Sequence, residues 1–214
     1  MKKNFEGSLY QKINTIADWV LRVVCINLLV VICSIPIVTI YPAFLAGYKL
    51  FNSYLEKKEV PIFRGFFKFF KENFKKKLEL GFLLAGAIVL GVINMTIYAS
   101  YLELNNDIIS VIGYYVMILL VISAVFVTLY TLPIMSTYPN TDTWLMIKFA
   151  FFLSGKYILR TVLAILIMLV PFVLLAFPVT IVFFFFAGVS IPILLYAFLF
   201  RKVTTFIESL GKEK

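Results

Sequence analysis

Residues 161–200 read TVLAILIMLVPFVLLAFPVTIVFFFFAGVSIPILLYAFLF and contain no Asp, Glu, Lys or Arg. A charged side chain at the centre of a membrane helix costs about 2.5 to 3.5 kcal/mol, so such a run is typical of a membrane-embedded segment. As a single helix it would extend about 60 Å, roughly twice the hydrocarbon thickness of a bilayer. We therefore expect it to fold back near residues 177–180, beside Pro178, and to form two spans. A single kinked and strongly tilted helix is the alternative.

Three further windows without charge lie at 23–48, 80–102 and 108–141, and each is long enough for one crossing helix of about 20 residues. The composition agrees, because 62% of the 214 residues are hydrophobic, only 14% are charged and the mean hydropathy is +0.99. Such a chain has too little polar surface for a water-soluble domain. We predict an all-α, polytopic membrane helix bundle, a single domain over 1–214, with about five spans near 20–41, 80–101, 108–132, 160–177 and 180–200.

Several classes of site are not indicated by the sequence. The chain has no histidine, which removes the commonest general base and the commonest metal ligand. Its two cysteines, Cys25 and Cys33, would lie about 12 Å apart along one helix, too far for a disulfide. No phosphate-binding loop, nucleophile elbow, zinc-protease motif or dinucleotide fingerprint is present. We expect no enzymatic activity, no catalytic residues, no cofactor and no metal site.

The net charge of +9 is distributed in a way that predicts topology rather than nucleic-acid binding. Nine Lys or Arg residues lie between Lys49 and Lys77, so we expect this segment to be cytoplasmic. If the first apolar segment crosses fully, the N-terminus lies outside, although it carries several basic residues of its own. If that segment is re-entrant, interrupted at Ser34-Ile35-Pro36 and again at Pro42, the N-terminus stays inside. The full crossing is the favoured interpretation.

Two amphipathic cytoplasmic helices are expected, at about 62–78 and 142–156. The first has aromatic residues at helical spacing along one face and lysines around the other, which suits the surface of an anionic inner leaflet. It is a candidate for anchoring to membrane lipids or for docking a protein partner. The residues that would form this surface are Phe63, Phe66, Phe67, Phe70, Phe74, Lys68, Lys71 and Lys75.

A few polar residues fall within or beside the predicted spans. Asn27 and Asn94 lie deep enough to hydrogen-bond between helices or, alternatively, to contact a substrate. Arg22 follows Asp18 by four residues at the edge of the first span, so we expect these two to form an ion pair. Asp142 precedes a helical pattern and is expected to cap it.

The chain resembles the YesL-like family of bacterial multi-span membrane proteins. The resemblance covers nearly the whole chain and is carried by the runs Asp18-Trp19, Asn27-Leu28-Leu29, Tyr41-Pro42-Ala43, Pro61-Ile62-Phe63 and Ile147-Lys148-Phe149-Ala150-Phe151-Phe152-Leu153. The family has no established biochemical activity, but its members are often encoded beside carbohydrate uptake and polysaccharide degradation systems.

The resemblance therefore implies a multi-pass protein of the bacterial cytoplasmic membrane, with an accessory or scaffolding role in carbohydrate uptake or its regulation. The partners implied are membrane lipids and sugar transporter subunits, and a homo-oligomer is left open. A small transporter or channel in its own right is the alternative function.

Overall fold

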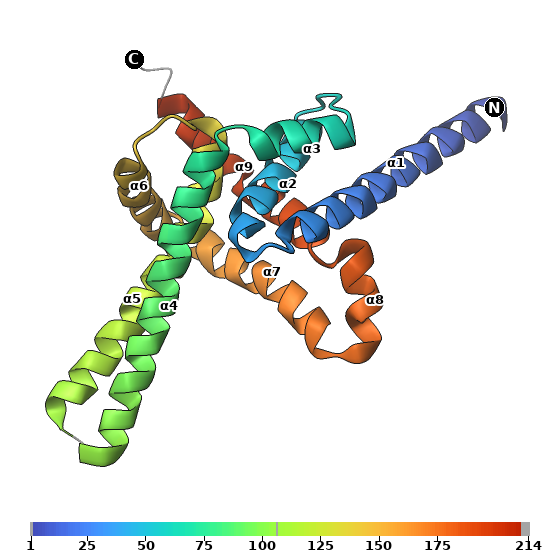
Figure 1. Cartoon of the computed structure of the whole chain (residues 1–214). Coiled ribbons are helices and arrows are strands. Elements are labelled where there is room, and N and C mark those ends of the chain that lie inside the picture. The colour runs from blue at the N-terminus through green and yellow to red at the C-terminus, as the bar shows by residue number, and fades with distance from the viewer. Residues whose placement is uncertain (1, 106, 211–214) are drawn as a thin grey trace. The chain divides into compact units, whose positions relative to one another are not determined.

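The computed structural model describes residues 2–105 and 107–210, which form helices joined by short connections (Figure 1). The α-helices are α1 (Lys2–Ser34), α2 (Ile40–Leu55), α3 (Ile62–Lys71), α4 (Phe74–Asn105), α5 (Ile108–Thr137), α6 (Thr143–Lys156), α7 (Ile158–Ala176), α8 (Ile181–Phe183) and α9 (Ser190–Leu210). Two short 3-10 helices, η1 (Ile37–Thr39) and η2 (Pro178–Thr180), and one π-helix, η3 (Phe184–Gly188), complete the secondary structure of these residues.

Within the described residues, five helices are long and apolar enough to cross a membrane: Gln11–Ser34, Phe74–Glu103, Ile108–Thr137, Ile158–Ala176 and Ser190–Leu210. The predicted all-α, polytopic helix bundle is confirmed. The chain divides into two compact units, one comprising the chain up to Glu72 with Leu166–Phe198, the other Asn73–Ile165 with the chain from Leu199 onward. The divisions fall between α3 and α4, within α7 and within α9.

The first unit is built on an antiparallel hairpin of α1 and α2. Helix α1 ends at Ser34, before Pro36, whose ring cannot continue an α-helix. The chain turns through η1 and returns, so that the Trp19 and Tyr54 ring centroids lie 6.5 Å apart. Nearer the turn, a Cβ atom at Gly47 would lie 3.1 Å from a methyl carbon of Val30. The helix of the first predicted span, near 20–41, therefore ends at Ser34, earlier than expected, because the apolar segment breaks before Pro36 and reverses direction.

Helix α2 was not predicted as an element, yet it contributes much of the core of the first unit. Its buried apolar residues are Tyr41, Ala43, Leu45, Ala46, Tyr48, Leu50, Phe51 and Tyr54. Helix α2 also buries a cation, since Lys49 is only 8% exposed and its Nζ lies 2.9 Å from Glu72 Oε2. A buried ammonium requires such a partner, because an unpaired charge away from water is costly.

The predicted helix over 62–78 is also wrong, because two helices occupy that stretch. Helix α3 ends at Lys71, Asn73 has a φ of 48°, and α4 begins at Phe74. Asparagine tolerates this left-handed backbone conformation better than most residues, so it can serve as the break.

The predicted fold-back near residues 177–180 is present. Helix α7 ends at Ala176, and the Thr180 hydroxyl donates to the carbonyl oxygens of Leu174, at 2.7 Å, and Phe177, at 2.9 Å. A Cβ atom at Gly188 would lie 3.0 Å from Leu174 Cδ1, so the chain after the turn packs against α7. The last long helix begins at Ser190 and ends at Leu210, later than the predicted 180–200, because α8 and η3 occupy the start of that range.

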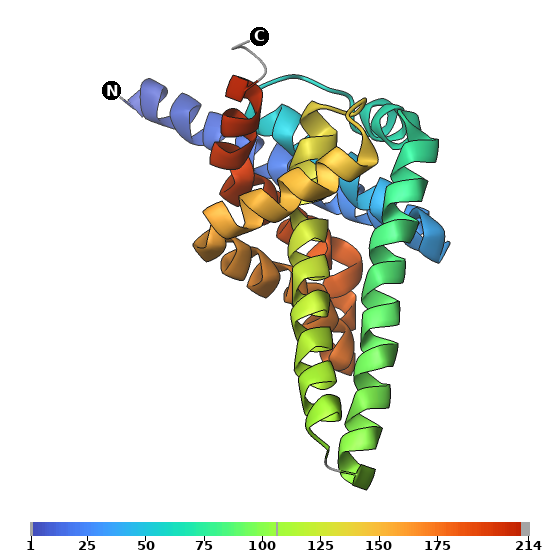
Figure 2. The same cartoon turned by 90° about the vertical axis from the view of Figure 1, so that its left-hand side faces the viewer.

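The second unit contains the long antiparallel hairpin of α4 and α5, which Figure 2 shows in green and yellow-green. Asp107 caps α5 by accepting a hydrogen bond from the backbone N–H of Ser110 at 3.3 Å. Asp142 accepts from the N–H groups of Trp144 and Leu145, which confirms the predicted start of α6.

Candidate functional site

Helix α3 places its aromatic residues on two different faces. Phe66 is completely buried, whereas the side chains of Phe63 and Phe67 are 59% and 42% exposed. Phe66 stacks on Phe70, with ring centroids 6.2 Å apart. The predicted aromatic stripe is thus divided, with Phe66 fixing the helix to the protein and Phe63 and Phe67 lying on the outside.

The lysines of the predicted surface are divided as well. Lys68 and Lys71 lie in the last turn of α3 and are exposed. Phe74 and Lys75 follow the break at Asn73 and belong to α4, in the second unit. The exposed surface that remains on α3 consists of Phe63, Phe67, Lys68 and Lys71, and we call it the α3 surface.

Close packing holds α3 against α2. A Cβ atom at Gly65 would lie 2.4 Å from Val60 Cγ1 and 3.1 Å from Leu50 Cδ1, so only a glycine fits there without displacement. The Tyr54 hydroxyl donates to the carbonyl oxygen of Val60 at 2.9 Å, which fixes the chain leading into α3. Together with the Lys49–Glu72 pair at its end, α3 is held at both ends and in the middle.

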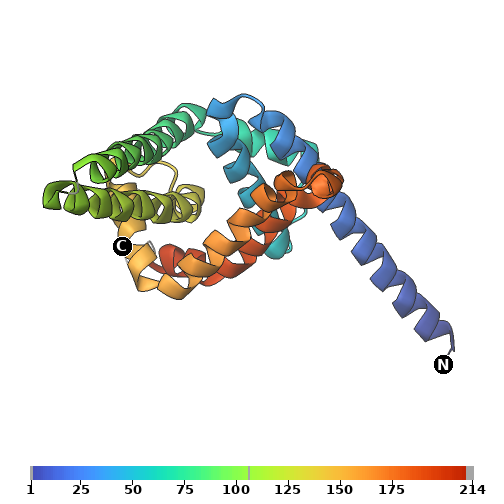
Figure 3. The same ribbon diagram turned by 90° about the horizontal axis from the view of Figure 1, so that it is seen from below.

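Helix α1 packs against η3, the segment leading into α9, and the two run close together in Figure 3. Asn27 of α1 is the second well-defined polar position, and it bonds to this segment. Its amide nitrogen donates to the carbonyl oxygens of Phe184, at 2.9 Å, and Phe185, at 2.7 Å. Its amide oxygen accepts from the backbone N–H groups of Val189 and Ser190, both at 2.9 Å. An asparagine amide has two donor hydrogens and two acceptor lone pairs, so all of its capacity is used.

Asn94 is placed differently. Its amide nitrogen donates to the carbonyl oxygen of Leu90, at 2.8 Å, within its own helix. Asn27 and Asn94 lie in different units and are not brought together into one site within either of them.

The expected ion pair between Asp18 and Arg22 is wrong, since no ion pair joins them in the part of the chain that the structure describes. The Arg22 guanidinium instead lies over the Tyr54 ring, 4.3 Å from its centroid, and 5.6 Å from the centroid of Trp19. Two aromatic faces attract this cation, and the return of α2 supplies the second.

Sequence reasoning missed the roles of Lys49 and Glu72. The two residues are separated by a helix end, a loop and a second helix, so no periodic spacing connects them. The only signal in the sequence is a lysine directly after a 26-residue window without charge. Among the described residues, no group of three His, Cys, Asp or Glu side chains could hold a metal ion.

Searches of curated proteins and of solved structures found no match to this chain. One family model does match, over the stretch that includes most of the α1–α2 hairpin, all of α3 and the first part of α4. Over residues 23–95 the chain is similar to the family described as Protein of unknown function, DUF624.

Proposed function

We propose that this chain is a non-catalytic accessory protein of the bacterial cytoplasmic membrane, associated with carbohydrate uptake or its regulation, which docks a sugar transporter subunit on the α3 surface. The observation that carries the proposal is the exposed Phe63 and Phe67 pair on a helix anchored by buried Phe66. Burying one such side chain in an interface is worth about 1.5 to 3 kcal/mol. The link to carbohydrate uptake rests on the resemblance to the YesL-like family, a finer grouping than the family match itself.

The lysines support the same role. Lys68 and Lys71 attract the anionic headgroups of the cytoplasmic leaflet, each by about 1 kcal/mol near the surface. They would keep α3 close to the bilayer, where the cytoplasmic loops of a membrane permease are found. In this proposal Phe63 and Phe67 contact a protein partner, and Lys68 and Lys71 contact lipid headgroups.

The topology that goes with this proposal places the N-terminal side of α1 and the whole of α3 in the cytoplasm. The stretch Gln11–Ser34 of α1 is long and apolar enough to cross on its own, but α2 returns along it and brings Tyr54 back beside Trp19. Helix α2 is about 24 Å long, shorter than the roughly 30 Å hydrocarbon core. A hairpin of this size enters the bilayer and returns to the same side. This re-entrant arrangement replaces the favoured full crossing, and it puts Lys12, Arg22 and the basic segment 49–77 on one side, as the positive-inside rule favours.

Reporter fusions test this topology directly. A fusion before Lys12 and an insertion at Lys58 should report the same, cytoplasmic, compartment. A fusion before Lys12 that is exported while the insertion at Lys58 is not would contradict the re-entrant hairpin.

The transporter alternative has no specific observation in its favour. The hydrogen bonds of Asn27 are all made to backbone groups, so this side chain has no capacity left for a substrate. Asn94 bonds within its own helix.

A photo-crosslinking amino acid at Phe67, in native membranes, tests the docking role. We expect a protein adduct identifiable as a transporter subunit, and a loss of most of its co-purification in mild detergent when Phe67 is changed to Ala. Phe172 on α7 is the matched control, since it is 69% exposed but lies in a candidate span and should give lipid adducts. If position 67 yields only lipid adducts, and the protein repeatedly purifies alone, the accessory role is rejected.

A further inference from the structure

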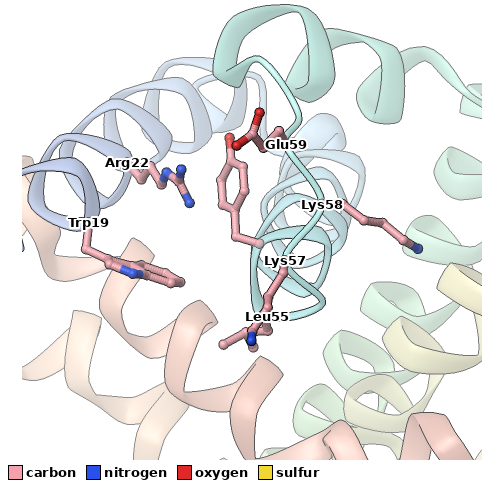
Figure 4. Close-up of a pocket in the computed structure, with 7 residues that line it drawn as sticks. Trp19, Arg22, Leu55, Lys57, Lys58 and Glu59 are labelled. Carbon is pink, nitrogen blue, oxygen red and sulfur yellow. The ribbon is translucent and has the colours of Figure 1, made fainter. Parts of the chain in front are cut away.

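A pocket of about 400 Å³ opens at the end of the α1–α2 hairpin, away from the turn at η1. Residues of α1, of the end of α2 and of the connection to α3 form its walls (Figure 4). The lining residues are Trp19, Arg22, Tyr54, Leu55, Lys57, Lys58 and Glu59. None of them belongs to the α3 surface, so the pocket is separate from the proposed docking role.

The pocket has an excess of positive charge, with three cationic side chains and one carboxylate in its lining. Lys58 is partly neutralised, because its Nζ lies 2.6 Å from Glu56 Oε2, and it extends away from Arg22 in Figure 4. Neither Arg22 nor Lys57 forms an ion pair with any residue in the described part of the chain. The positive charge available to a ligand therefore comes from these two side chains and is reduced by the Glu59 carboxylate in the same lining. The Lys57 side chain also extends away from Arg22 in Figure 4, so it has to turn toward the pocket for both cations to reach one ligand.

Lys57 occupies a backbone position that glycine would adopt at no cost. Helix α2 ends in a Schellman motif, in which the N–H of Lys57 bonds the carbonyl of Tyr54 at 3.0 Å and the N–H of Lys58 bonds that of Ser53 at 2.9 Å. Lys57 has a φ of 60°, the left-handed conformation that glycine adopts without cost. A β-carbon in this conformation is unfavourable for stability, and strain of this kind is concentrated at functional sites.

The aromatic residues set the geometry of the pocket. Arg22 lies over the Tyr54 ring and near Trp19, so its guanidinium is held in place while its N–H edges remain available. The Tyr54 phenol is neutral at physiological pH and adds no negative charge to the pocket. Its hydroxyl is already bonded to Val60, so the cations are the groups left to bind a ligand.

We propose that this pocket binds the phosphate group of an anionic phospholipid, with Arg22 and Lys57 contacting the phosphate oxygens and Trp19 lying against the glycerol part of the headgroup. A guanidinium offers two parallel N–H groups to a phosphate, and an ammonium adds a point charge. Tryptophan and tyrosine favour the headgroup level of a bilayer, which is where the end of a membrane hairpin lies. The opening at the end of the hairpin favours a headgroup over a ligand free in solution, although a free phosphate would use the same chemistry.

The chain has only two tryptophans, which makes a direct binding assay possible. In a Trp144→Phe background, Trp19 is the sole tryptophan and reports on the pocket. The protein in neutral detergent is titrated with short-chain phosphatidylglycerol, with phosphatidylcholine of the same chain length, and with inorganic phosphate. We expect a saturable change in Trp19 fluorescence with phosphatidylglycerol, and responses at least roughly ten-fold weaker with the other two.

Two variants separate binding from folding. Arg22→Gln and Lys57→Gly should each weaken phosphatidylglycerol binding roughly ten-fold. Lys57→Gly should also leave the thermal midpoint unchanged or raise it, because glycine relieves the left-handed strain at this position. Lys12→Gln is the matched control, since it removes one exposed positive charge from the same helix outside the pocket.

The outcomes are distinct. An equal response to phosphatidylcholine, or an equal loss with Lys12→Gln, would reject a specific headgroup site. An equal response to inorganic phosphate would replace the lipid by a free anion and overturn the proposal. Failure of transporter docking at Phe67 would leave this result unaffected, because the assay contains no partner protein.

Discussion

Changing Asn27 to Leu removes four hydrogen bonds at one buried position while keeping the number and branching of the side-chain heavy atoms. The four partners are backbone groups of Phe184, Phe185, Val189 and Ser190, which lie in η3 and at its junction with α9. A π-helix bonds each N–H to a carbonyl five residues back, so groups at its ends are left without the regular helical partner. Asn27 supplies those partners from α1.

The size of the effect follows from these contacts. Interhelical hydrogen bonds within membranes contribute about 0.6 kcal/mol each on average, so four of them contribute roughly 2.5 kcal/mol. A buried peptide group that finds no new partner costs about 1 to 3 kcal/mol. Some relaxation of η3 into an α-helical arrangement would recover part of this cost. We expect Asn27→Leu to lower the free energy of unfolding by roughly 2.5 to 6 kcal/mol.

Asn94→Leu is the matched control, because within the described residues the Asn94 side chain bonds to Leu90 of its own helix and to no other element. Unfolding in mixed micelles of neutral detergent and dodecyl sulfate, followed by far-ultraviolet circular dichroism, gives the two free energies. Hydrogen exchange at Val189 and Ser190 gives the local effect, and both amides should lose protection in Asn27→Leu alone. If the two variants differ in stability by less than about 0.5 kcal/mol, or if the Val189 and Ser190 amides stay protected, the proposed role of Asn27 is refuted.

Three further outcomes are expected. Glu72→Gln should destabilise the protein by about 1 to 2 kcal/mol because it leaves buried Lys49 without its carboxylate, and the double variant with Lys49→Met should recover much of that loss in the same unfolding assay. Gly91→Ala should cost about 1 to 3 kcal/mol, since its Cβ would lie 2.6 Å from a valine of α5, whereas Gly86→Ala, with no atom within 4 Å, should be neutral or slightly stabilising. The hydrogen bond from Ser110 lowers the pKa of Asp107 in the folded protein, so the ionised carboxylate stabilises the fold fully above its unfolded pKa and loses this effect as the pH falls through the folded pKa. Asp107→Asn should flatten that part of the curve of unfolding free energy against pH, and an unchanged curve would contradict the assignment.

The spans could be predicted from sequence because the cost of a charge in hydrocarbon acts at each position separately. Residues 80–101 and 108–132 lie within α4 and α5, and the fold-back beside Pro178 was placed within a few residues. The run 23–48 was harder, since its composition fits both a crossing helix and a hairpin. The close approach of Gly47 to Val30 decides between them, and no local pattern encodes it.

The candidate surface was predicted in part for a similar reason. Helical periodicity correctly predicts that Phe63 and Phe67 are neighbours on one face. It also predicts that the helix continues past Asn73, but the left-handed conformation of this residue ends the regular spacing. The sequence allows the expectation that Asn27 hydrogen-bonds between helices, because its polar side chain lies within an apolar span. It does not identify the partners, which lie more than 150 residues away in the chain.

The short α1–α2 hairpin has a consequence for how the protein enters the membrane. In the proposed topology the two legs enter and leave the bilayer on the same side, so the re-entrant form exists only after α2 has been synthesised, up to residue 55. The stretch Gln11–Ser34 of α1 is itself long and apolar enough to cross, so before α2 is complete it can insert as a single span. A truncation that stops before α2 should therefore insert α1 as a crossing helix, whereas one that includes α2 should keep both ends of the hairpin on the same side.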